Sequence, residues 1–445
     1  MTRRGEGVEI VVHGAEAHAP ALQSIEGRTI SAWREEARAT LSLPSGPLFA
    51  TGHQSECWHA GILAKSLWVQ AVARREGAHA VHLVVDQDGF DGMPLEWPFR
   101  RPDGWWGVRG HRFAAPAESS AAVACAAFRP RAVEAGEGVE PRVSASVQAI
   151  HDALAAHADA PSAAVQGALA MLDLAGAWLM RPALVRASDL MRTALAQRLL
   201  ERMLEDPESC ARHFNASLRH APRAARALQV RGADSELPVW LLGPDGTRMR
   251  AGSTELRGAL TRGEAVLPRA FLMSAIARTV LADRFTHGLG GGVYEQATDR
   301  WIRAWLGWSP PPHDVVSASL RMDLPMPQEP ARSAIPWRRA WCDPDLLESG
   351  GTGPSAARRR ALELIASIPP RDPRRRAAFR DLVNERNSGR LRRSGELDAL
   401  RGAEEAAGAA RLARELAARR TWCFALLDPR RVTALRDALE ARAEA

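Results

Sequence analysis

The stretch that organises this chain is PLFATGHQSECWHAGILAKSLWVQAVARREGAHAVHLVVDQDGFD, residues 47–91. It begins with a short apolar run, breaks at Thr51-Gly52, and continues with apolar residues at helical spacing from Trp58 to Val72. This pattern predicts a strand, a tight turn and a helix. After Gly77, an apolar run at 80–85 predicts a buried parallel strand, so the stretch forms one β-α-β unit.

Polar residues follow both predicted strands. The first strand leads into Thr51-Gly52-His53-Gln54, and the second leads into Asp86-Gln87-Asp88. Ligands of open parallel sheets bind beyond the carboxyl ends of the strands, where helix amino termini supply free N–H groups and a positive dipole end. The sequence therefore predicts a ligand site at this edge of the sheet.

Two residue types each occur once in a chain that is rich in Ala and Arg. Lys65 is the single lysine and Tyr294 is the single tyrosine. Lys65 lies in the predicted helix of the β-α-β unit, and Tyr294 ends the glycine-dense stretch His287–Tyr294. A chemical requirement would explain why both persist, and chance is the alternative. The hypothesis is that the two side chains face one shared cavity.

Length and composition limit the protein class. A chain of 445 residues suggests two or three packed units, and its hydrophobic content of 46% is ordinary for a globular protein. No apolar run approaches the roughly 20 residues of a membrane span, and the N-terminus has no apolar segment of a secretory signal. The five cysteines show no CxxC spacing. These features indicate a cytoplasmic protein with reduced thiols and no membrane partner.

The net charge of +7 raises the question of nucleic acid. The arginines are interleaved with Glu and Asp along predicted helices, as in residues 411–420, which is typical of a solvated helix face. Nucleic acid is therefore not the expected partner. RNA binding through the basic surface is kept as a third hypothesis.

The order of predicted elements indicates an α/β fold with a Rossmann-like parallel-sheet core. Strands are expected at 8–12, 237–243 and 313–320, and amphipathic helices at 30–41 and 269–285. The segment after the linker at 329–336 contains long helices at 356–367, 373–387 and 391–420, typical of a helical hairpin or short coiled coil. The expected regions are core residues 1–142, a helical insertion at 143–224, core residues 225–328, and a C-terminal helical region at 337–445 that docks on the core.

The segment from Thr51 to Lys65 carries the strongest chemical pattern. Gly52 at a strand end lets a ligand approach the backbone, and His53 with Gln54 supplies neutral donors at the start of a helix. The spacing resembles the HxGH motif of the class I nucleotidyl-transferase superfamily, with Ile62 at the position of the last histidine. Resemblance to that superfamily implies that the histidines stabilise charge on nucleotide phosphates.

Two further clusters are candidates for binding. Asp86 and Asp88 are spaced so that their carboxylates could hold Mg²⁺, a ribose or an amine, and turn-capping is the alternative. Four glycines in the five residues 288–292, before a predicted helix, favour an anion-receiving nest, and a plain linker is the alternative.

The three motifs, in this order, resemble those of the bacillithiol-biosynthesis cysteine-adding enzyme family, a group of cysteine ligases. The corresponding stretches are Gly52-His53-Gln54, Asp86-Gln87-Asp88 and Gly290–Tyr294. His53 stands where that family has Gln, and Gln87 where it has His. The resemblance implies a Rossmann-like ligase core, a coiled-coil appendage, a homodimer formed through the C-terminal helices, and nucleotide binding.

The first hypothesis is therefore a ligase or nucleotidyl-transferase-like enzyme that uses ATP or another nucleotide, with Mg²⁺, to join an amine to a carboxylate-type small molecule. The alternative is a non-catalytic helical scaffold built on an inherited core. The residues expected to carry catalysis are His53, His59, Lys65, Asp86 and Asp88, and those expected to bind the nucleotide are Thr51, Gly52, Gln54, Gly61, His287, Gly288, Gly290, Gly291, Gly292 and Tyr294.

Overall fold

The predicted β-α-β unit forms strand β5 (Leu48–Gln54), helix α2 (Ala60–Glu76) and strand β6 (His79–Val85). The tight turn expected at Thr51-Gly52 is wrong, because β5 continues through both residues to Gln54 and stays paired with β6. The structure is a computed structural model that describes residues 3–5, 8–14, 23–115, 121, 123–326, 335–349 and 354–445. β5 and β6 pair in parallel along their whole lengths. The helix begins at His59, whose side chain accepts a hydrogen bond from the Gly61 N–H, and it ends at Gly77, where φ is 64°. Glycine suits that left-handed position because it has no Cβ atom.

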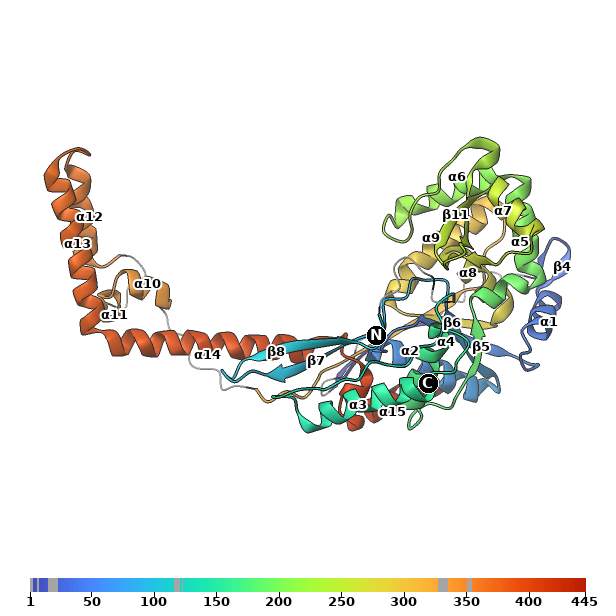
Figure 1. Cartoon of the computed structure of the whole chain (residues 1–445), viewed down its shortest axis with the longest axis horizontal. Coiled ribbons are helices and arrows are strands. Elements are labelled where there is room, and N and C mark those ends of the chain that lie inside the picture. Colours follow the sequence, from blue (N-terminus) through green and yellow to red (C-terminus); the bar gives the residue numbers. More distant parts are fainter. Residues whose placement is uncertain are drawn as a thin grey trace. The chain divides into compact units, whose positions relative to one another are not determined.

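These two strands belong to a seven-stranded sheet (Figure 1). Five of its strands run parallel, and their chain order β5, β6, β9, β13, β14 becomes the spatial order 3-2-1-4-5. In that order the connections turn to opposite sides between β5 and β13, which is the switch point where open α/β sheets bind ligands. The sheet order is β1 (Arg3–Gly5), β2 (Val8–His13), β14 (His313–Leu320), β13 (Arg284–His287), β5, β6, β9 (Ala183–Arg186), with β2 antiparallel to β14.

Besides the three-residue strand β1, two strands of this sheet were not predicted. The helix expected at 269–285 is wrong only at its end: α8 (Ala270–Ile276) continues as a π-helical turn, Ala277–Leu281, and β13 then begins at Arg284. β9 lies within the region 143–224 that was expected to be helical throughout. Both strands have four residues, which is too short for a period of two to show in the sequence.

Helices and small sheets surround the central sheet. α15 (Pro429–Glu444) packs on α2, and a hydrophobic core joins the sheet to α1, α5, α6, α8 and α9. The remaining elements of this part are β3 (Ser24–Ile25), β4 (Arg28–Thr29), α1 (Ile30–Thr40), β7 (Pro94–Arg100), β8 (Trp106–Arg112), α3 (Pro141–Ala156), α4 (Ala163–Leu174), α5 (Ala194–Glu205), α6 (Pro207–Ser217), β10 (Glu236–Leu242), β11 (Arg248–Gly252), α7 (Ser253–Thr261), β12 (Val266–Pro268), α9 (Leu289–Leu306), and short 3₁₀ turns at Ser188–Arg192, Leu218–His220, Gly232–Asp234 and Phe424–Leu426.

The chain divides into two compact units. Unit 1 comprises Met1–Phe99, Val108–Asp323 and Arg419–Ala445, so residues 143–224 form part of it and not a unit of their own. Unit 2 comprises Arg100–Gly107 and Leu324–Ala418. No helix among the described residues is both long and apolar enough to cross a membrane. The helices of unit 2 are α10 (Trp337–Cys342), α11 (Leu346–Ser349), α12 (Ala356–Ser367), α13 (Pro373–Arg392) and α14 (Ser394–Ala418).

A buried charge network fixes α9 against the segment that leads into β13. The Arg278 guanidinium, only 1% exposed, donates to Glu295 Oε2 at 2.5 Å and to Asp299 Oδ1 at 2.7 Å. Its Nε donates to the carbonyl oxygen of Pro311 at 2.9 Å, ahead of β14. Glu295 Oε1 lies 3.3 Å from His287 Nε2. The network thus connects α9 to the two strands beside it.

We expect Glu295→Ala to lower the free energy of unfolding of unit 1 by about 3 kcal/mol, because it leaves a buried guanidinium with an incomplete set of partners. Urea denaturation followed by circular dichroism measures this loss. Glu201→Ala is the matched control: Glu201 pairs with Arg198 on an exposed helix face, so its loss should change stability by less than about 1 kcal/mol. Equal effects of the two substitutions would contradict a structural role for the network.

Candidate functional site

A cavity of about 450 Å³ lies at the carboxyl ends of β5 and β13, at the switch point of the sheet. Lys65 and Tyr294 both line it, as do residues from all three sequence motifs. The fold therefore brings together segments more than 200 residues apart in the chain. The predicted site residues that line the cavity are Gly52, His53, Gln54, His59, Gly61, Lys65, Asp88, His287, Gly288, Gly290, Gly291 and Tyr294.

Three predicted site residues lie outside the cavity lining. The Thr51 hydroxyl donates to the carbonyl oxygen of Thr286 at 2.8 Å and so joins β5 to β13. The Asp86 carboxylate is fully buried and accepts hydrogen bonds from the N–H and the hydroxyl of Ser188. Burial raises the pKa of Asp86, and these two hydrogen bonds act in the opposite direction. A Cβ atom at Gly292 would lie 2.6 Å from Val315, so this glycine permits close packing of α9 on β14.

Two helices direct their amino termini at the cavity. The lining includes the first turn of α2, with its cap residue His59, and the first turn of α9, residues 288–291. The cap residue of α9 is Gly288, which has no side chain to satisfy the N–H groups of that turn. Free N–H groups and the positive end of the helix dipole attract anions. The cavity therefore has the backbone features of a phosphate site.

Glycine at position 52 allows the strand end to form. A Cβ atom at Gly52 would lie 2.7 Å from the carbonyl oxygen of Leu83 on β6, too close for any other residue without displacement of the backbone. Gly290 differs, because a Cβ atom there would meet no atom within 4 Å. A side chain at position 290 would thus occupy open space in the first turn of α9, beside the cavity.

Lys65 supplies the fixed cation inside the cavity. It is 6% exposed, and its Nζ donates to the carbonyl oxygen of Gly52 at 2.6 Å. Burial lowers the pKa of Lys65 to about 8, and the nearby Glu56 acts in the opposite direction. The side chain is thus largely protonated at pH 7, and it donates its hydrogen bond to the Gly52 carbonyl, which carries no charge.

The three cavity histidines are uncharged at neutral pH. Burial lowers the pKa of His53, and the neighbouring cation Lys65 lowers it further. Burial also lowers the pKa of His59, to about 4, and the neighbouring cation Arg420 acts in the same direction. Burial also holds the pKa of His287 well below its ordinary value. His53 contacts the Glu56 carboxylate through Nε2. These rings therefore offer neutral hydrogen-bonding groups to a ligand.

Among the described residues that line the cavity, Asp88 is the one with a carboxylate side chain. It accepts a hydrogen bond from Gln54 and lies 3.4 Å from the Arg248 guanidinium. Asp86 and Asp88 therefore do not present a pair of carboxylates to the cavity. Within the described ranges, no group of three or more His, Cys, Asp or Glu side chains is arranged to hold a metal ion.

Sequence reasoning did not select four polar or sulfur-containing residues that line the cavity. Gln87 belongs to the Asp86-Gln87-Asp88 motif but was not selected as a site residue, whereas the other three come from α8, from β14 and from the segment after α14, where no local motif marks them. Only the fold brings them to the site. They are Gln87, Met273, Ser317 and Arg420.

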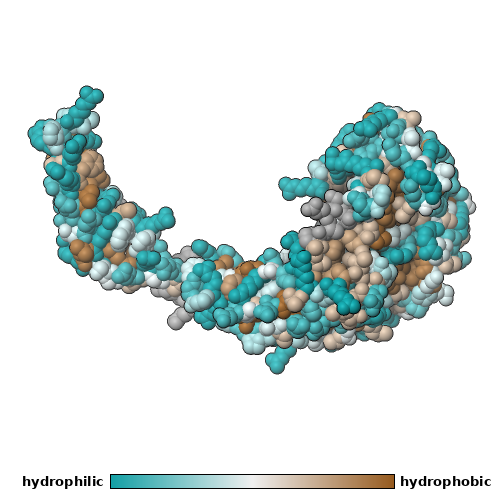
Figure 2. Space-filling view, viewed as in Figure 1, coloured by the Kyte–Doolittle hydropathy of each residue, from teal (hydrophilic) through white to brown (hydrophobic). Residues whose placement is uncertain are grey.

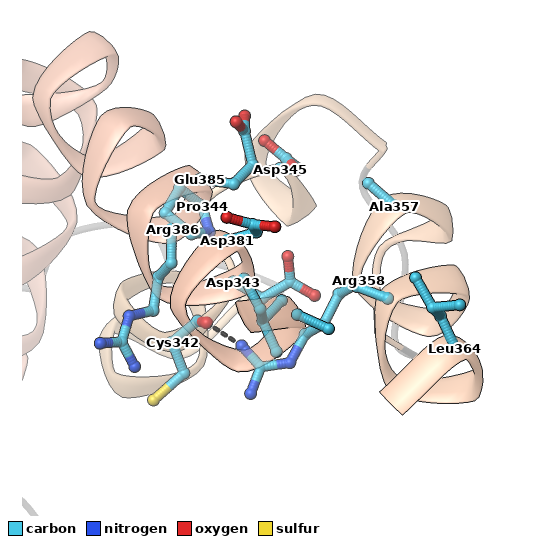
Figure 3. Close-up of a pocket in the computed structure, with 13 residues that line it drawn as sticks. Cys342, Asp343, Pro344, Asp345, Ala357, Arg358, Leu364, Asp381, Glu385 and Arg386 are labelled. Carbon is cyan, nitrogen blue, oxygen red and sulfur yellow. Dashed lines mark hydrogen bonds between the residues drawn. The ribbon is translucent and has the colours of Figure 1, made fainter. Parts of the chain in front are cut away.

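Unit 2 has a cavity of its own, of about 330 Å³ (Figure 3). The Ala and Leu residues of its lining belong to α12 and α13. Arg358 donates a hydrogen bond to the carbonyl oxygen of Cys342, and Asp343 accepts one from the Ser355 N–H at 2.7 Å. Carboxylates outnumber the arginines here, so this cavity does not suit an anionic ligand. The carboxylates are those of Asp343, Asp345, Asp381 and Glu385.

In comparisons with known proteins, no family model and no curated protein sequence matches this chain. The resemblance to the cysteine-adding ligase family therefore stays an expectation based on three motifs. The function has to be argued from the cavity itself.

We expect chemical labelling of Lys65 to titrate with a midpoint near pH 8, because burial lowers the pKa of its ammonium group. Acetic anhydride labelling followed by peptide mass spectrometry measures this midpoint. The sequence has one lysine, so Lys65 is its only side-chain amine. A midpoint near 10.5 would contradict burial of the charge.

The same shift has a consequence for stability. A pKa lowered from 10.5 to about 8 corresponds to roughly 3 kcal/mol of unfavourable charge burial, present below pH 8 and relieved as the pH rises from 8 to 10.5. Lys65→Met should therefore stabilise the fold at pH 7, and its advantage over the wild type should shrink across that pH window. Destabilisation by this substitution would show that Lys65 has a structural role.

Proposed function

We propose that this chain is a nucleotide-dependent ligase with a Rossmann-like core, whose phosphate site is the cavity between β5 and β13. One observation carries this proposal: the single lysine and the amino termini of α2 and α9 line the same cavity at the switch point of the sheet. Each of these features favours an anion, and together they favour the phosphates of a nucleotide.

The residues fit a nucleotide in two ways. Lys65 and the N–H groups of residues 288–291 supply positive charge, and the glycines of that turn leave the backbone accessible. The neutral ring of His59, whose Nδ1 accepts from the Gly61 N–H, adds an Nε2 donor that needs no counter-charge. Fixed donors of this kind stabilise the charge that develops on phosphates during transfer.

In the proposed reaction, a carboxylate oxygen of one substrate attacks the α-phosphorus of the nucleotide, and pyrophosphate leaves. An amine nitrogen then attacks the acyl carbon, loses a proton, and the nucleoside monophosphate leaves. Asp88 and Gln54, which line the cavity and hydrogen-bond to each other, would orient the amine. Magnesium commonly binds one or two carboxylates and the phosphates of a substrate, and Asp88 is the carboxylate that would serve such an ion.

The alternative is a scaffold whose working surface is unit 2. Figure 2 shows apolar residues among the hydrophilic surface of its helices, which is typical of a surface that binds a protein, including a second copy of this chain. The exposed large apolar residues of these helices are Trp341, Leu362, Leu364, Phe379, Val383 and Leu391. This alternative needs no ligand in the unit 1 cavity.

We expect ATP to stabilise the wild-type protein, by about 2.7 kcal/mol at a concentration one hundred times its dissociation constant. Thermal unfolding with and without ATP, supported by calorimetric titration, measures this gain. Lys65→Met should lose it while keeping the fold. If no nucleoside phosphate raises the melting temperature of the wild type at millimolar concentration, the ligase proposal fails and the scaffold is favoured.

A second test uses the open space at Gly290. Gly290→Asp places a negative charge in the first turn of α9, which favours the helix but repels an anion in the cavity. We expect nucleotide affinity to fall on the order of tenfold or more, with stability unchanged or higher. Gly290→Asn has nearly the same shape without the charge, and it should bind the nucleotide much more tightly than the Asp variant. Equal affinities would place the phosphates elsewhere.

A further inference from the structure

The segment after α14 brings a second cation to the cavity. This segment is held against the start of α2: the Phe424 N–H donates to the carbonyl oxygen of Trp58 at 2.7 Å, and Cys423 pairs with His59 as an isolated antiparallel bridge. Arg142 also donates to the carbonyl oxygen of Leu426 at 2.6 Å. Backbone contacts thus hold the segment at the rim of the cavity, independently of the conformations of its side chains.

Two adjacent arginines of this segment have different surroundings. Arg419 stacks on the Trp422 ring, with its Cζ 4.7 Å from the ring centroid, and it pairs with Glu96. Arg420 lines the cavity and donates to the Ser317 hydroxyl at 2.9 Å. Among the described residues, Arg420 has no carboxylate partner. The charge of Arg419 is thus balanced within the protein, and that of Arg420 is not.

The cavity therefore contains two cations that lack a balancing carboxylate at hydrogen-bonding distance, and they come from different elements. Lys65 comes from α2 and contacts Gly52 on β5, while Arg420 comes from the C-terminal segment and contacts Ser317 on β14. His59, the cap of α2, is near Arg420, which contributes to the lowered pKa of its ring. A guanidinium can donate two parallel hydrogen bonds to one phosphate, in a geometry that an ammonium group does not offer.

We propose that Arg420 binds a second phosphate of the nucleotide, separate from the phosphate held by Lys65 and the helix amino termini, and so makes the cavity select nucleoside di- and triphosphates over monophosphates. This inference rests on the proposed function. On binding, the guanidinium exchanges the neutral Ser317 hydroxyl for phosphate oxygens. A charged partner makes the stronger hydrogen bond, so the exchange favours the ligand.

The test compares calorimetric affinities for ATP, ADP and AMP in the full-length protein. Arg420→Ala should weaken ATP and ADP binding at least tenfold and change AMP binding less than threefold, because AMP has no second phosphate. Arg420→Lys should restore part of the ATP affinity. Arg419→Ala is the matched control, since it removes the same charge one residue away, and it should leave all three affinities within threefold of wild type.

The outcomes separate this inference from the proposed function. If the wild type binds none of the three nucleotides, both fail. If the wild type binds ATP and Arg420→Ala binds it equally well, the phosphate site stands and the role of Arg420 is overturned. A uniform loss of affinity for ATP, ADP and AMP would likewise overturn a contact specific to the second phosphate.

Discussion

A buried ammonium group that hydrogen-bonds to a neutral oxygen is the constraint on which the site depends. Lys65 lies on α2, a helix whose residues 60–73 are buried between the sheet and α15, and its side chain lines the cavity. Burial of such a charge is unfavourable unless an anion compensates it. The glycines around the cavity, the uncharged histidines and the uncapped turn of α9 are all compatible with such an anion.

The parts of the fold that sequence could predict are those with long, regular patterns. α2, β6, β14 at 313–320 and α12 at 356–367 have the expected bounds or nearly so, because apolar runs and helical spacing persist over enough residues to be distinctive. β13 was hidden because the apolar spacing of α8 continues through the π-helical turn almost to Phe285. Only its pairing between β5 and β14 makes that segment a strand.

The same limit applies to the site. Residues at the carboxyl ends of β5 and β6 could be placed together because parallel strands end at one edge of a sheet. The sequence could not show that Asp86 and Asp88 have different surroundings, since Ser188, the hydrogen-bond partner of Asp86, lies about one hundred residues further along the chain. Arg420 and Arg419 are equivalent in the sequence, and only the attachment of the C-terminal segment to α2 makes one face the cavity and the other face Glu96.

The assembly of unit 1 from three separated segments has a consequence for biosynthesis. α15 covers α2 but follows the helices of unit 2 in the chain, whereas β2, at the antiparallel side of the sheet, precedes α2. The nascent chain must therefore hold the apolar surface of α2 without its final cover while unit 2 is translated. The partly folded intermediate should depend on chaperones until α15 has been synthesised, since exposed apolar surface of this kind promotes aggregation.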